Sequence, residues 1–92
     1  MKIVWSPYAL ESYENTIIHL VGRWPIGVAL RFQVLVRNQI QLISTNHKIC
    51  PKSITNGLRK CVIHKNVSLV YQIHKTEIEI VAFIDNRMGH NY

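Results

Sequence analysis

The fold is decided by residues 77 to 87, which read E-I-E-I-V-A-F-I-D-N-R. In an extended chain the three isoleucines and Ala82 point one way, while Val81 and Phe83 point the other. Because both faces are largely apolar, the run predicts a central strand that is buried on two sides. The hydrophobic residues stop at Asp85-Asn86-Arg87. We therefore expect the Arg87 guanidinium to stand at the exit of the strand and to reach solvent.

The size and composition are those of one globular domain. The chain has 92 residues, of which 48% are hydrophobic and 17% are charged. This is enough for a single core over residues 1–92 and too little for two domains. The formal net charge of +6 favours an anionic partner, which could be nucleic acid, an acidic protein or a membrane surface. A basic domain without such a partner is the alternative that charge alone leaves open.

The sequence carries no signal for export or membrane insertion. Its start lacks the hydrophobic region of a signal peptide, and no run approaches the roughly 18 apolar residues of a spanning helix. Two cysteines do not make a disulfide framework, so we expect a cytoplasmic protein with reduced thiols.

The first half of the chain predicts a short strand followed by two helices. Residues 2–5 are apolar and end at Ser6-Pro7, a good N-cap followed by a good first helical residue. Apolar residues three and four apart then predict one amphipathic helix up to Gly22 and a second from about Val28 to Ser44. The expected inward-facing residues are Ala9, Leu10, Tyr13, Ile17, Leu20, Val21 and Trp24, then Phe32, Leu35, Val36, Leu42 and Ile43.

The second half predicts three strands, at about 58–64, 67–74 and 77–85. The connections between them are so short that only antiparallel hairpins can use them. The predicted fold is therefore α+β with the order β-α-α-β-β-β, in which a helical hairpin packs on one face of a small antiparallel sheet. The pattern does not decide where the first strand joins that sheet.

Basic residues gather on and beside the three strands. We expect neighbouring strands to carry these groups to one side or one end of the sheet, where they would suit a phosphate or a carboxylate. A solvated sheet edge protected by lysines is the alternative. The basic residues are Lys48, Lys52, Arg59, Lys60, His64, Lys65, His74, Lys75, Arg87 and His90.

Two short motifs, His47-x-x-Cys50 and Cys61-x-x-His64, look like halves of a zinc site. Residues three apart on a strand point to opposite faces, so Cys61 and His64 can share an ion only if a bulge intervenes. We therefore expect no metal and no cofactor, and we interpret the cysteines as small buried thiols. Five acidic residues and no Gly-rich phosphate loop leave Arg, Lys, His and Tyr as the groups for any chemistry.

Four segments together resemble the RelE/ParE superfamily, the small basic toxins of bacterial type II toxin–antitoxin modules. They read I-V-W-S-P-Y-A at 3–9, G-L-R-K-C-V-I at 57–63, L-V-Y-Q-I at 69–73 and I-E-I-V-A-F-I-D-N-R at 78–87. The resemblance implies the fold predicted above and a cognate acidic antitoxin as partner. Such antitoxins cover the toxin's helices and sheet, and we expect contacts with Tyr8, Ile26 and Leu30.

The superfamily holds two activities. RelE-like members cut messenger RNA within the ribosome, using Lys and Arg residues on the sheet plus a C-terminal Tyr or His, whereas ParE-like members poison DNA gyrase. The resemblance suggests Arg59, Lys65, Arg87, His90 and Tyr92 as catalytic candidates, and Arg59, Lys60, Lys65 and Arg87 as target-binding candidates.

Several departures from the nuclease pattern favour the ParE-like side. Ser68 stands where RelE-like nucleases carry an arginine, and Cys61 and Ile63 stand where they tend to have lysines. Met88-Gly89-His90 replaces the more usual ending, and the chain stops at Tyr92. The resemblance thus favours a toxin that binds gyrase. A ribosome-dependent ribonuclease and a non-toxic or decayed basic domain are the alternatives.

Overall fold

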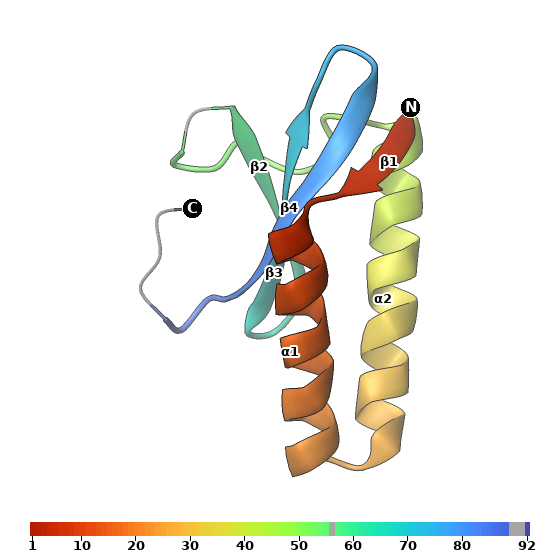
Figure 1. Cartoon of the computed structure of the whole chain (residues 1–92), viewed down its shortest axis with the longest axis vertical. Helices are drawn as coiled ribbons and strands as arrows, with labels where there is room; N and C mark the ends of the chain where they lie inside the picture. The colour runs from red at the N-terminus through yellow and green to blue at the C-terminus, as the bar shows by residue number, and fades with distance from the viewer. Residues whose placement is uncertain (56, 89–91) are drawn as a thin grey trace.

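A helical hairpin lies on one face of a four-stranded sheet (Figure 1). The computed structural model describes residues 1–55, 57–88 and 92. The α+β class and the predicted order of elements are confirmed. The elements are β1 (Lys2–Trp5), α1 (Pro7–Arg23), α2 (Ile26–Thr45), β2 (Leu58–His64), β3 (Val67–Ile73) and β4 (Glu77–Asp85). Within the described residues, none of the helices is long and apolar enough to cross a membrane.

The strand β4 is central, as its two apolar faces predict. The strand order is β1-β4-β3-β2, so β4 has β1 on one side and β3 on the other. The pairs β2–β3 and β3–β4 are antiparallel, but β1 runs parallel to β4. The sheet is therefore mixed, whereas the sequence predicts one that is antiparallel throughout. A parallel pair needs a long connection, which the two helices, β2 and β3 together provide here.

A β-bulge at Val81 interrupts the alternation of side chains along β4, so the predicted direction of the later residues is wrong. Val70 pairs with Ala82 and Tyr71 with Ile80, so Val81 is an extra residue without a partner on β3. Ile78 and Ile80 face the helices as expected, but beyond the bulge it is Phe83 that belongs to the core beneath them. Ala82 and Ile84 lie in a second, smaller cluster with Val70 on the opposite face of the sheet.

The bulge is held by the start of α1. The strand β1 ends beside Ile80, and from there α1 replaces it as the neighbour of β4. Ser6 caps α1 by accepting a hydrogen bond from Ala9 N at 2.9 Å, and its Oγ donates to the carbonyl of Val81 at 3.0 Å. The buried Ser12 Oγ accepts a hydrogen bond from Phe83 N at 3.0 Å. The capping residue Ser6 therefore satisfies the carbonyl of Val81, and Ser12 of α1 satisfies the N–H of Phe83. Neither backbone group is reached by β1.

The helices expose more apolar residues than their periodicity predicts. Ala9, Leu20, Phe32, Val36 and Ile43 are buried, as expected. The inward assignment is wrong for Leu10, Val21, Trp24, Leu35 and Leu42, which are all exposed. The apolar stripe of each helix is wider than the face that the sheet can cover, so its flanks remain at the surface.

Trp5 packs at the edge of the core, where it is still 36% exposed. Trp5 packs its ring against Tyr13 and Phe83, with centroids 5.4 Å away in both cases. Trp24 is 57% exposed at the end of the hairpin, so the expected core role is wrong for this residue.

The cysteines form a disulfide, which corrects the expectation of reduced thiols. Cys50 and Cys61 are bonded to each other across a sequence separation of 11 residues, with their Cα atoms 5.3 Å apart. The loop between α2 and β2 folds back along β2, where Lys60 N donates to the carbonyl of Pro51 at 3.1 Å. Because this fold-back is invisible to local periodicity, the sequence did not show that the two sulfur atoms meet.

We expect Ser12→Ala to destabilise the fold by about 1–3 kcal/mol, because it leaves the Phe83 N–H buried and unpaired. The free energy of unfolding from urea titration measures the loss. The control is Ser44→Ala, since Ser44 Oγ donates only to Gln41 O within its own helix. Equal stability of the Ser12 and Ser44 variants would contradict a special role for Ser12.

We expect loss of the disulfide to cost about 2–3 kcal/mol, because the closed loop restricts the unfolded chain. Thermal unfolding with and without a reducing agent measures this contribution. In the variant with both Cys50→Ser and Cys61→Ser, the unfolding temperature should be low and should not respond to the reductant. If the wild-type protein also fails to respond, the disulfide does not form in solution.

Candidate functional site

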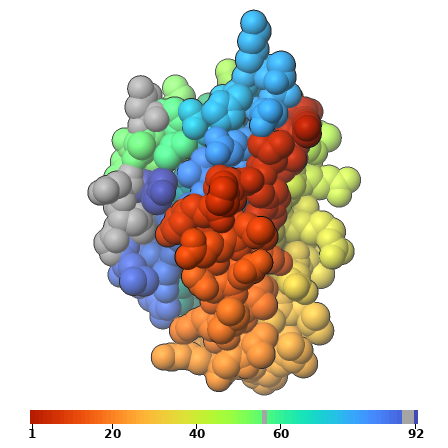
Figure 2. All heavy atoms as spheres, in the orientation of Figure 1, coloured from red at the N-terminus to blue at the C-terminus, as the bar shows by residue number. Residues whose placement is uncertain are grey.

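A cleft of about 890 Å³ runs between one flank of α1 and the exit of β4. Figure 2 shows α1, in red to orange, facing the viewer with blue atoms of the end of the chain beside it. The floor of the cleft is apolar and includes Leu20, Val67, Phe83 and Ile84. Clefts of this size with an apolar floor and a few polar groups at the rim are typical of binding sites.

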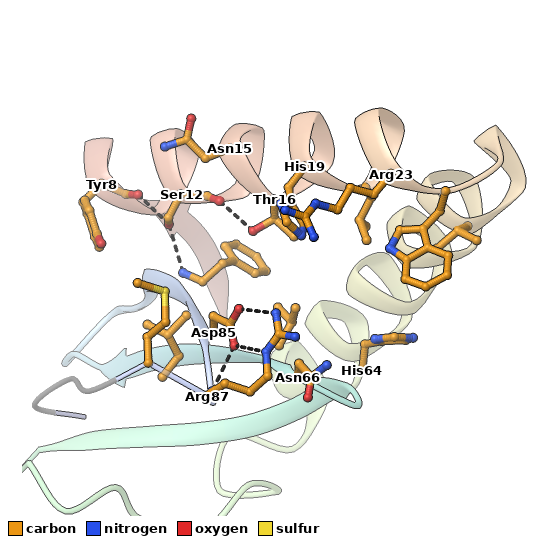
Figure 3. A pocket seen from close by; sticks show the side chains of 17 residues that line it. Tyr8, Ser12, Asn15, Thr16, His19, Arg23, His64, Asn66, Asp85 and Arg87 are labelled. Carbon is orange, nitrogen blue, oxygen red and sulfur yellow. Dashed lines mark hydrogen bonds and ion pairs between the residues drawn. The ribbon is translucent and has the colours of Figure 1, made fainter.

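One wall of the cleft is a single stripe of α1. It consists of Tyr8, Ser12, Asn15, His19 and Arg23, which follow one another at intervals of three or four residues (Figure 3). Residues at this spacing share one face of a helix. The sequence reasoning missed His19 and Arg23 as site residues, because it treated α1 only as a cover for the core. The polar i, i+4, i+7 spacing on the flank of the apolar stripe is the signal that could have found them.

The opposite wall carries an ion pair between Asp85 and Arg87. Arg87 Nε donates to Asp85 Oδ1 at 3.0 Å and Nη2 donates to Oδ2 at 2.7 Å (Figure 3). The backbone N–H of Arg87 donates to the same Oδ1 at 2.9 Å. The arginine does reach solvent, as predicted, with 62% of its side chain exposed. However, its guanidinium is not free but is held in a bidentate pair by a neighbouring carboxylate.

The ion pair shifts the pKa of both partners. Hydrogen bonds from the side chain and then the backbone of Arg87, with a smaller contribution from His19, lower the pKa of Asp85 to about 2. The same pair raises the pKa of Arg87. Asp85 is therefore ionised across the physiological range. It is the only acidic residue lining the cleft among the described residues, where it faces Arg23, Arg87, His19 and His64.

A second bulge brings His64 to this cleft. Val62 pairs with Ser68 and His64 pairs with Val67, so Ile63 is an extra residue on β2. His64 lines the cleft with Val67 as a result, on the face of the sheet that also carries Cys61. The expectation that Cys61 and His64 face opposite ways is wrong for this reason. The two sulfur atoms are bonded to each other, so neither is a thiolate for a metal.

The predicted basic residues do not form one cluster. Arg59 lies near the start of β2, and its Nη1 donates to the carbonyl of Cys50 at 2.7 Å, which ties it to the folded-back loop. Lys60 follows it on the same strand and therefore points to the other face of the sheet. Lys65 lies at the opposite end, where Asn86 N donates to the carbonyl of Asn66 at 2.7 Å. The expectation of one cationic side or end is therefore wrong.

The catalytic candidates are also separated. Arg59 and Arg87 lie at opposite ends of the sheet, since Arg59 pairs with Tyr71 whereas Asp85 pairs with Val67. Tyr92 packs on the second cluster, on the face away from the helices. His90 lies outside the described residues. Lys65 is exposed in the turn between β2 and β3, beside the exit of β4.

The three residues expected to contact an antitoxin are all exposed. Tyr8 is 53% exposed and lines the cleft, whereas Ile26 and Leu30 lie on α2 outside it. Leu10, Ile18 and Val21 of α1 are exposed as well. The outer surface of the hairpin is therefore apolar enough to suit a protein partner.

We expect Arg87→Ala to raise the pKa of Asp85 from about 2 towards its usual value, because the two side-chain hydrogen bonds are lost. The rise should be incomplete, since the backbone N–H of residue 87 remains. NMR titration of the Asp85 carboxyl carbon measures the midpoint, and Arg31→Ala on α2 is the control. In the wild type, the stabilisation from this pair should be present above the unfolded pKa and be lost as pH falls through about 2. A midpoint of about 2 in Arg87→Ala would contradict the assignment.

Comparison with known proteins agrees with this architecture. The family model for the ParE toxin of the type II toxin–antitoxin system parDE matches residues 3–89. No curated protein sequence matches the chain. A solved structure of the chromosomal ParDE system from P. aeruginosa is similar, with a TM-score of 0.78, 17% identity and coverage of 92% of this chain and 95% of that chain.

Two other solved structures share the fold at comparable sequence distance. The YoeB dimer from Staphylococcus aureus gives a TM-score of 0.64 at 19% identity, covering 89% of this chain and 92% of that chain. The E. coli DinJ–YafQ complex gives a TM-score of 0.62 at 12% identity, covering 94% and 93%. Because the family model spans nearly the whole sequence, the chain belongs to the ParE toxin family of type II toxin–antitoxin systems, within the RelE/ParE superfamily that it resembles.

Proposed function

We propose that this toxin inhibits growth by binding DNA gyrase, without cleaving RNA, and that it acts in the cytoplasm, where an acidic antitoxin neutralises it. The observation that carries the proposal is the separation of Arg59 and Tyr92 from Arg87. General acid–base catalysis on a phosphodiester needs its groups within hydrogen-bond reach of one reacting site. Arg59 and Arg87 stand at opposite ends of the sheet, and Tyr92 stands on its other face.

The face of the sheet away from the helices also supports binding rather than cleavage. Val70, Ala82 and Ile84 form an apolar cluster there, with Leu58 and Tyr92 packed against it. Ser68 is fully buried, and its hydroxyl has no hydrogen-bond partner within the described residues. A buried neutral hydroxyl cannot supply the positive charge that a RelE-like nuclease carries at this place.

The proposed target-binding residues are those at the exit of β4. Arg87 lies there and Arg23 faces it across the cleft. Lys65 belongs to the β2–β3 turn, whose Asn66 carbonyl accepts a hydrogen bond from Asn86 N. Arg59 is already engaged with the carbonyl of Cys50 at the other end, so we assign it to the loop structure. The antitoxin is proposed to cover the exposed apolar residues of the hairpin, among them Ile26 and Leu30.

We expect the purified toxin to inhibit DNA supercoiling by gyrase and to leave ribosome-bound messenger RNA intact, because Arg59 and Arg87 are too far apart to act on one phosphodiester. Supercoiling of relaxed plasmid and primer extension on a translating ribosome are the two measurements. Toxin saturated with its antitoxin is the matched control and should leave supercoiling normal. Cleaved messenger RNA with normal supercoiling would identify a ribonuclease, and induction without growth arrest would identify a decayed toxin.

A further inference from the structure

The cleft beside α1 is long enough for a segment of protein chain. Its wall extends from Tyr8 to Arg23, a span that rises about 23 Å along a helix axis. An extended peptide of about seven residues has the same length. The volume of about 890 Å³ is far larger than one side chain needs.

The charges in the cleft select an anion. Arg23 and His19 come from α1, and Arg87 and His64 come from the sheet (Figure 3). Arg23 forms no ion pair within residues 1–55, 57–88 and 92. Asp85, the acid that lines the cleft, uses both of its oxygens on Arg87. The Arg87 guanidinium can bind a carboxylate with two parallel hydrogen bonds, and in this cleft it is already occupied by a carboxylate of its own chain.

The apolar groups in the cleft can supply affinity that the ion pair cannot. Trp24 is 57% exposed and Met88 is 68% exposed, and both line the cleft near the arginines. Exchange of one carboxylate for another on a solvent-exposed guanidinium is close to neutral in free energy. Burial of these apolar side chains against a partner is what would drive association.

We infer that this cleft docks an acidic segment of a partner protein, one carboxylate of which replaces Asp85 on the Arg87 guanidinium. Asp85 is then a built-in competitor that holds the guanidinium in place and weakens the binding of any other carboxylate to Arg87. A nucleic acid fits less well, because its backbone needs several free cations in a row and one of the guanidinium groups in the cleft, that of Arg87, is already paired with Asp85. The inference rests on the proposed function for the identity of the partner, the acidic antitoxin.

The test measures the affinity of purified toxin for its antitoxin, expected from the neighbouring gene, by isothermal titration calorimetry. Arg87→Ala and Arg23→Ala should each weaken binding about tenfold or more. Asp85→Asn should tighten it about two- to fivefold, because the competitor loses its charge while the acceptor for the Arg87 backbone N–H remains. Lys75→Ala, at an exposed lysine between β3 and β4, should leave affinity unchanged.

The double variant identifies the mechanism. The effects of Arg87→Ala and Asp85→Asn on affinity should not be additive, since in the Arg87→Ala background the two carboxylates no longer compete for one guanidinium and only their mutual repulsion remains. Thermal unfolding shows whether Arg87→Ala is folded, and the isosteric Asp85→Asn decides the question if it is not. Unchanged or weaker binding by folded Asp85→Asn would overturn the inference.

Further outcomes separate this inference from the proposed function. An antitoxin that binds all arginine variants equally well would overturn the docking site and leave the toxin assignment intact. An antitoxin that does not bind the wild-type toxin would overturn both the docking site and the proposed partner. Displacement of the antitoxin by a twelve-nucleotide RNA, dependent on Arg87, would show a nucleic-acid site instead.

Discussion

The structure depends on the bulge at Val81, where β4 passes from β1 to α1. Up to Ile80 the backbone of β4 bonds to a parallel strand, and beyond it two serines of α1 provide the hydrogen bonds. The extra residue reverses the direction of every later side chain on β4. Without it, Phe83 and Asp85 would point away from the helices. With it, Phe83 packs under Tyr13 with ring centroids 5.2 Å apart, and Arg87 faces α1.

The arrangement of elements could be predicted from sequence, whereas the site could not. Strand and helix bounds follow from local signals, such as the Ser6-Pro7 start of α1 and the short connections between the last three strands. The direction of Asp85, which holds Arg87, depends on a bulge that is stabilised by residues more than seventy positions earlier in the chain. The disulfide likewise depends on how a loop without periodicity folds back. Such long-range hydrogen bonds leave no local pattern to read.

The positive charge is divided between the two ends of the sheet. At one end, Arg59 binds the carbonyl of Cys50 beside the disulfide, so part of the charge serves to hold a loop. At the other end, Arg23 and Arg87 line the cleft at the exit of β4, where Arg87 is paired with Asp85. Net charge therefore overstated the cationic surface that is available to a partner. The usable part is smaller, and it lies next to exposed apolar side chains rather than in a polar groove.

Cationic residues next to exposed apolar side chains make it possible for the toxin to bind a partner, and they also make a partner necessary. Ile18, Val21, Trp24, Ile26 and Leu30 are all about half exposed or more, an apolar surface that a small monomer rarely leaves open. Charge keeps such a chain apart from its own copies but gives no discrimination among other surfaces. Arg87 adds that discrimination, because an apolar ligand without an acid gains nothing from the guanidinium. A partner with a correctly placed acid gains both contacts at once, and its binding also stabilises the folded toxin by mass action.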